Sequence, residues 1–211
     1  MSRPRLRIIA LAAACGFVPA PAATAGDAVS ASTFTVQPGG PRTGRAGALF
    51  FNIEGRKNGD GGKYASFGVV EFKTADLTEG DLKDGALTLT LTQDIAGFSA
   101  DGPLKFYLAR STVDPRAQKF DLATIDGLGA QVTMKDLIGS GAFKKRDSGK
   151  ADAFPLKLDG AALAYLKGRA AKNEPIQIVI VPDDETVAAT FLGAGSSDVS
   201  KRPRLSAGTP R

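Results

Sequence analysis

The chain offers carboxylates and phenols for chemistry but few of the residues that usually act as nucleophiles or zinc ligands. It contains no histidine and a single cysteine, Cys15. Ser-His-Asp catalysis, Cys-His catalysis and ordinary zinc sites are therefore excluded. The remaining catalytic option is a carboxylate pair of the kind used in glycoside hydrolysis, with Glu54, Glu71, Asp76 and Asp114 as candidates. Because no activated constellation is visible in the sequence, we expect a protein that is not an enzyme.

Oxygen donors for a hard cation are the metal-binding groups that this chain can supply. Asn52 and Glu54 stand in an early alternating segment, and Asp183, Asp184 and Glu185 stand in a later polar turn. Carboxylate and amide oxygens are the ligands that calcium prefers. The competing interpretation is a polar turn without metal, since no D-x-D-x-D-G pattern joins these residues. The predicted metal ligands, for a structural calcium, are Asn52, Glu54, Asp183 and Asp184.

Binding of a saccharide requires exposed aromatic rings beside polar groups. The chain has no tryptophan and three tyrosines. Tyr107 should point away from its apolar neighbours in the segment LKFYL, and Tyr64 follows a basic glycine-rich loop. The predicted ligand-binding residues are therefore Arg56, Lys63, Tyr64 and Tyr107. A second basic loop, Lys144–Lys150, adds charge that would attract an acidic polysaccharide, although loops of this kind also serve only to keep a protein soluble.

The first 25 residues predict export. Three arginines within residues 3–7 precede an apolar run over residues 8–18, and an A-x-A sequence at residues 23–25 predicts cleavage before Gly26. The run is too short to span a membrane. Lipidation at Cys15 is the alternative, although the leucine that usually precedes such a cysteine stands one place too early. We therefore expect a secreted or periplasmic protein that does not span the membrane.

Removal of this segment changes the charge and the redox chemistry of the chain. The segment holds three of the 27 basic residues and none of the 22 acidic ones, so the net charge falls from +5 to +2. No stripe of Lys and Arg interleaves with aromatic residues, so we expect no nucleic-acid partner. The mature chain has no cysteine and therefore no disulfide.

Short strands must position the candidate residues. Residues 86–92 alternate most clearly, with Leu87, Leu89 and Leu91 on one side and threonines on the other. Weaker alternation predicts strands over residues 48–54, 64–73, 104–110, 119–125, 130–134 and 153–158. Residues 26–45 read as a flexible lead-in that contains one early strand, Ser32–Val36. Residues 46–208 are then a single domain.

The C-terminal part combines one helix with three strands. A helix is predicted over residues 159–168, with Asp159 capping its start, Tyr165 on its buried face and Gly168 ending it. The segment IQIVIV at 176–181 is apolar on both faces and predicts a strand covered on both sides. A returning strand over 187–192 and a closing strand after Pro203 complete the pattern. Many short strands with one helix predict an all-β, two-sheet antiparallel β-sandwich of the jelly-roll type.

These C-terminal elements resemble the end of the DNRLRE-type domains, a family of secreted jelly rolls related to carbohydrate-binding modules. The matching segments are ALAYLKG, PIQIVIVP, ATFLGAGSSD and KRPRLSA, with YASFGVVEFKTADL and LTLTL upstream. The resemblance covers roughly Phe34 to Gly208, but the chain lacks tryptophan and the usual arginine of the early strand. It implies a jelly-roll fold and a structural calcium between the sheets near the first and last strands.

Three functions follow as alternatives. The first is a secreted, non-catalytic module that binds an extracellular polysaccharide or a matrix protein, for which a groove lined by tyrosine and basic residues would be evidence. The second is a structural or adhesive protein that assembles through an apolar patch or an open strand edge. The third, which we do not favour, is a carboxylate-dependent enzyme acting on glycans.

Overall fold

The computed structural model describes residues 25–35, 40–41, 49–55, 66–94, 97–110 and 134–208. Residues 1–24 of the predicted export segment, the predicted strand at 119–125 and residues 130–133 of the predicted strand at 130–134 lie outside these residues. The elements in chain order are β1 (Ala25–Thr35), β2 (Gly40–Pro41), β3 (Phe50–Glu54), β4 (Ser66–Phe72), β5 (Ala86–Thr92), β6 (Gly102–Ala109), β7 (Met134–Phe143), β8 (Ala151–Lys157), α2 (Gly160–Ala171), β9 (Ile176–Pro182), β10 (Ala188–Leu192), the 3-10 helix η2 (Val199–Lys201) and β11 (Arg204–Ala207).

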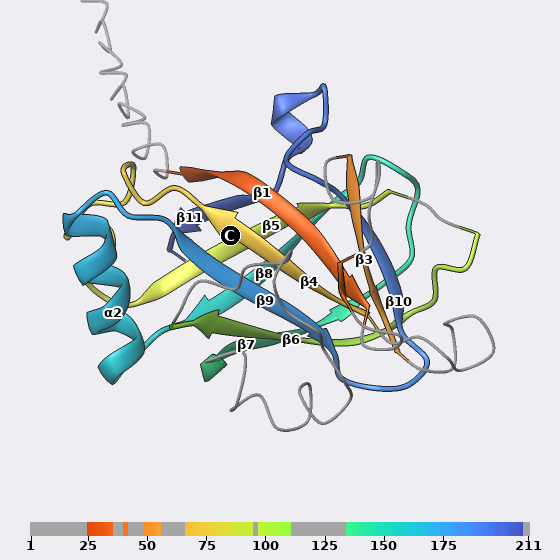
Figure 1. The fold of residues 1–211 in the computed structure, drawn as a ribbon, viewed down its shortest axis with the longest axis horizontal. Coiled ribbons are helices and arrows are strands. Elements are labelled where there is room, and N and C mark those ends of the chain that lie inside the picture. Colours follow the sequence, from red (N-terminus) through yellow and green to blue (C-terminus); the bar gives the residue numbers. More distant parts are fainter. Residues whose placement is uncertain are drawn as a thin grey trace, which may run out of the picture.

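The strands form two antiparallel layers around one core (Figure 1). They follow the order β7-β6-β9-β4-β1-β11-β5-β8, with β3 joining β4 to β10 and β2 pairing with β1. Every strand pair is antiparallel. The prediction of an all-β, two-sheet sandwich with one short helix is confirmed.

Strand β1 belongs to both sheets. Its first residues, Ala25–Asp27, pair with β11, and its remainder pairs with β4 after an irregularity between Ala28 and Ser30. The sequence predicts that this strand begins at Ser32, but in the structure it begins at Ala25. The residues before Ser32 are mostly small and carry little strand propensity of their own, so the pairing partners decide their conformation. A Cβ on Gly26 would lie 2.5 Å from the carbonyl oxygen of Lys73, so the backbones approach closely here.

Alternating leucines and phenylalanines fill the space between the sheets. Leu87, Leu89 and Leu91 are buried, as the alternation predicts. Phe106 packs on Phe154 with ring centroids 4.9 Å apart, a distance at which aromatic pairs attract. Around them, β7 approaches β8 so closely that a Cβ on Gly141 would lie 2.6 Å from Cδ1 of Phe154. Strand β9 is buried on both faces, which confirms the prediction for IQIVIV.

Helix α2 covers one end of the sandwich with Ala162 and Leu166 buried and Tyr165 half-buried against the core (Figure 1). Two predictions about its ends are wrong. The carboxylate of Asp159 makes no capping hydrogen bond; its backbone carbonyl accepts from Ala162 N at 3.0 Å instead. Gly168 lies inside the helix, which continues to Ala171 and ends before Asn173, whose φ of 54° is left-handed. No helix in the described ranges is both long and apolar enough to cross a membrane.

Candidate functional site

Tyr107 stands on the outward face of β6. The residues on either side of it, Phe106 and Leu108, are fully buried in the core, whereas Tyr107 and Lys105 are half-buried on the other face. This is the orientation that the alternation of LKFYL predicts. A strand fixes its side chains by pairing on both sides, and β6 pairs with β7 and β9 along its length. The position of the Tyr107 ring is therefore set by the sheet.

The two cross-strand neighbours of Tyr107 differ in exposure. On one side lies Val179 of β9, which is fully buried, and on the other lies Leu137 of β7, which is 54% exposed. The tyrosine therefore marks the boundary between the covered centre of the outer face and its open border. The sequence does not single out Leu137, because it falls in a segment, MKDLIGSGAF, whose alternation is weak.

An ion pair lies on the same face, beside the tyrosine. The Nζ atom of Lys105 is 2.5 Å from Oδ1 of Asp183, and both side chains are about one-third exposed. This hydrogen bond raises the pKa of the Lys105 ammonium above its usual range, with the nearby charges of Asp183 and Tyr107 acting in the same direction. The backbone N–H of Asp183 donates to the carbonyl of Pro103 at 3.0 Å. We call Lys105, Tyr107, Leu137 and Asp183 the Tyr107 face.

Two of the four basic side chains in the loop Lys144–Lys150 pair with acidic neighbours. Lys144 Nζ lies 3.3 Å from Oδ2 of Asp101, and the backbone N–H of Lys145 donates to Oδ1 of the same residue at 2.8 Å. These two contacts lower the pKa of the Asp101 carboxyl. Arg146 pairs with the buried Asp152 at 3.1 Å. The loop therefore presents less free positive charge than its sequence indicates.

Gln93 fixes the same loop from inside the protein. Its Nε2 donates to the carbonyl of Lys144 at 2.7 Å and to Oδ2 of Asp152, and its Oε1 accepts from the backbone N–H of Arg146 at 2.9 Å. Sequence reasoning missed this residue. The signal was present, because the period of two that buries Leu87, Leu89 and Leu91 also places Gln93 on the inward face.

The predicted calcium ligands come from elements that meet in space. Glu54 at the end of β3 is opposite Ala188 of β10, and the adjacent Gly55 packs against the backbone of Asp184 and Glu185. Asn52 and Glu54 are buried. The pairing of β3 with β10 is what brings the strand end and the turn together.

The two aspartates of the predicted calcium site already have other partners. Asp183 pairs with Lys105. Oδ1 of Asp184 accepts from Thr186 N at 2.7 Å, from Thr186 Oγ1 at 2.9 Å and from Val187 N at 2.8 Å, which closes the turn between β9 and β10. Within the described part of the chain, no three His, Cys, Asp or Glu side chains are grouped to hold a metal ion. A calcium bound by Asn52, Glu54, Asp183 and Asp184 stays a prediction.

The remaining candidates are distributed over separate elements or lie outside the described ranges. Glu71 on β4 accepts a hydrogen bond from Gln177 Nε2 at 3.0 Å, and Asp76 lies exposed in the connector that follows. Arg56, Lys63, Tyr64 and Asp114 lie outside the residues that the structure describes. Of the four predicted ligand-binding residues, the structure thus places Tyr107 alone.

Comparison of the chain with protein-family models and with curated proteins finds no match. The resemblance to DNRLRE-type domains therefore stays an expectation from the sequence.

Proposed function

We propose that this protein is an exported, non-catalytic β-sandwich module that binds an extracellular polysaccharide or matrix component through the Tyr107 face. The observation that carries the proposal is the half-exposed ring of Tyr107 beside the exposed Leu137 on a rigid sheet. An aromatic ring gives a sugar a flat apolar surface, and a ring fixed in advance loses little conformational entropy on binding. Lys105 and Asp183 supply a donor and an acceptor beside it.

The charges around this face favour a neutral polysaccharide over an acidic one. Lys105, Lys144 and Arg146 each pair with an aspartate. A cation whose charge is already compensated adds little long-range attraction for a polyanion, and salt screens what remains. We therefore expect binding that depends weakly on ionic strength. The acidic polysaccharide that the sequence of the two basic loops predicts stays the alternative, because residues 56–63 lie outside the described part of the chain.

The test compares wild-type protein, beginning at Gly26, with the Tyr107→Ala variant against a panel of neutral and acidic soluble polysaccharides by affinity electrophoresis. We expect a neutral polysaccharide to retard the wild-type protein and Tyr107→Ala to weaken its binding about five- to thirtyfold, the size expected for a lost stacking contact of about 1–2 kcal/mol. Phe98→Ala is the matched control, because Phe98 is an exposed aromatic ring, at 45%, outside the Tyr107 face. Equal retardation of wild type and Tyr107→Ala would contradict the proposal.

The strand edges favour a second candidate function, assembly into a structural or adhesive layer. At one end of the strand order, β8 carries Pro155 and Lys157, which discourage pairing with another strand. At the other end, β7 exposes Leu137, Ser140 and Ala142, and residues 137–143 contain neither proline nor charge. Sedimentation of wild type and of Leu137→Lys at increasing concentration tests this candidate. If the protein assembles through β7, the wild type should self-associate as its concentration rises and the Leu137→Lys variant should not.

A further inference from the structure

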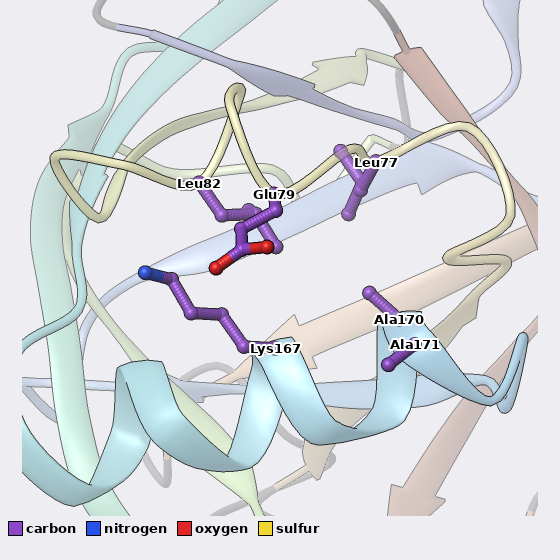
Figure 2. A pocket seen from close by; sticks show the side chains of 6 residues that line it. All are labelled: Leu77, Glu79, Leu82, Lys167, Ala170 and Ala171. Atoms are coloured by element: carbon purple, nitrogen blue, oxygen red, sulfur yellow. The ribbon is translucent and has the colours of Figure 1, made fainter.

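A separate pocket lies between helix α2 and the connector that follows β4. It has a volume of about 400 Å³ and is lined by Leu77, Glu79, Leu82, Lys167, Ala170 and Ala171 (Figure 2). This volume lies within the range of about 300–1,000 Å³ that is usual for small-molecule sites. The first three residues come from the connector and the last three from the C-terminal half of α2, so the pocket exists only because the two segments pack together.

The floor of the pocket is apolar and its rim carries one charge of each sign. Leu77 and Leu82 are buried members of the core, and Ala170 packs against it. Glu79 and Lys167 reach into the space between the connector and the helix from opposite sides (Figure 2). Neither side chain makes a hydrogen bond or an ion pair within 4 Å in the described part of the chain. Both charged groups are therefore available to a ligand.

The walls of the pocket are fixed by hydrogen bonds that do not use these two charges. In the connector, Thr78 and Asp81 cap each other, with Thr78 N donating to Asp81 Oδ2 at 3.0 Å and Asp81 N donating to Thr78 Oγ1 at 3.2 Å. Thr74 Oγ1 donates to the carbonyl of Glu174 at 2.8 Å, which joins the connector to the chain after the helix. A pocket with fixed walls loses little entropy when a ligand enters.

Arg169, the other cation within α2, already has partners of its own. Arg169 Nη1 lies 2.9 Å from Oε2 of Glu174, and its Nε and Nη2 donate to the carbonyl of Pro175. Arg169 also lies over the ring of Tyr165, with its Cζ 5.9 Å from the centroid. It therefore does not compete with Lys167 for an anion, and the charge pattern at the pocket is one ammonium group facing one carboxylate.

We infer that this pocket binds a small zwitterion with a short aliphatic body, such as a free aliphatic α-amino acid. The ligand carboxylate pairs with Lys167, its ammonium group pairs with Glu79, and its aliphatic side chain covers Leu77 and Leu82. A simple carboxylic acid would meet repulsion from Glu79, and a simple amine would meet repulsion from Lys167. A neutral apolar molecule would bury both charges without replacing their water. A small ligand with one charge of each sign pairs with both groups at the rim, and its aliphatic side chain covers the apolar floor.

The test uses L-leucine as the probe in a calorimetric or NMR titration of the folded chain from Gly26. Two related molecules isolate the charges: 4-methylpentanoic acid lacks the amine, and 3-methylbutylamine lacks the carboxylate. We expect leucine to bind more tightly than either. Lys167→Gln and Glu79→Gln should each weaken leucine binding about two- to fivefold, the range for one solvent-exposed charge pair. Ala171→Leu, which places bulk in the pocket from an exposed helix position, should weaken it at least tenfold.

Lys172→Gln is the control for the lysine variant, because Lys172 is exposed at the helix end and does not line the pocket. Thermal melting of each variant serves as the check that the variant is folded. Absence of leucine binding to folded wild type overturns the inference, and so does binding that Lys167→Gln, Glu79→Gln and Ala171→Leu all leave unchanged. Tyr107→Ala should leave leucine binding intact, so the outcome here is independent of the proposed polysaccharide site.

Discussion

The Nε2 atom of Gln93 lies 2.5 Å from Oδ2 of Asp152, and both residues are more than nine-tenths buried. This contact joins the end of β5 to the beginning of the edge strand β8. Through Arg146, which reaches Asp152 at 3.1 Å, it also holds the loop between β7 and β8. A buried polar network of this kind stabilises a fold only when every member has its partner.

Removal of Asp152 should therefore be among the most destabilising polar substitutions in the described part of the chain. Asp152→Ala removes one of the two acceptors of the Gln93 amide and leaves Arg146 without its ion-pair partner. We expect a loss of about 2–4 kcal/mol in the free energy of unfolding, measured by urea denaturation. Asp76→Ala, at an exposed carboxylate, should change it by less than about 0.5 kcal/mol. Similar values for the two variants would show that the network contributes little.

The Asp101 carboxyl should make a pH-dependent contribution to the free energy of unfolding. The backbone N–H of Lys145 and the ammonium of Lys144 lower its pKa in the folded protein below the ordinary 3.8. The unfolded chain then binds the proton at higher pH than the folded chain, so this contribution is present above 3.8 and is lost as the pH falls through the folded pKa.

Urea denaturation at a series of pH values tests this expectation with Asp101→Asn. The variant should be less stable than wild type near neutral pH. The difference should shrink toward zero as the pH falls far enough to protonate Asp101 in the folded as well as in the unfolded chain. Asp147→Asn serves as the control in the neighbouring loop, where the side chain is exposed. A wild-type advantage that persists unchanged at low pH would exclude the proposed cause.

Two glycines should respond to the same substitution in opposite ways. A Cβ on Gly141 would meet the Phe154 ring at 2.6 Å, so Gly141→Ala should cost about 1–3 kcal/mol through overpacking between β7 and β8. Gly168 lies within α2 with open space around its Cβ position, so Gly168→Ala should stabilise the protein by about 0.5–1 kcal/mol. Thermal and urea denaturation of both variants check the signs. Gly97→Ala, where nothing lies within 4 Å, should be close to neutral.

Asp184 distinguishes a turn cap from a metal ligand. Its carboxylate accepts three hydrogen bonds from Thr186 and Val187. Asp184→Ala should therefore lower the free energy of unfolding by about 1–2 kcal/mol, as the loss of a capping residue does, and the melting temperature with it. If the cap is its whole role, the loss is equal in EDTA and in calcium. A calcium-dependent rise in the wild-type melting temperature that Asp184→Ala removes would instead establish the calcium site that the sequence predicts.

The fold was predictable where side-chain alternation is strong. The leucines of β5 and the two-sided apolar run of β9 determine which faces are buried, and the structure places them as expected. Strand β1 was only partly predictable, because its small residues gain their strand conformation from β4 and β11. Gly168 misled for a related reason: packing of the buried face of α2 outweighs the low helix propensity of one glycine.

The candidate sites were less predictable than the fold. Tyr107 could be assigned to an outward face from its parity with Phe106, but its contrast with Leu137 and Val179 depends on cross-strand register. The pairing of Lys144 and Arg146 with aspartates from other elements lowers the free positive charge of the loop, and the loop sequence alone does not predict it. Glu79 and Lys167 carry no motif, and only the packing of α2 on the connector brings them to one pocket.

The position of β11 has a consequence for the order of events during biosynthesis. In the sheet, β11 lies between β1 and β5, although it is the last of these strands to be synthesised. Both neighbours leave the ribosome before the strand that joins them exists, and contacts between such distant segments form slowly. The sandwich therefore closes only after synthesis of residues 204–207, and until then β1 and β5 each present an unpaired edge.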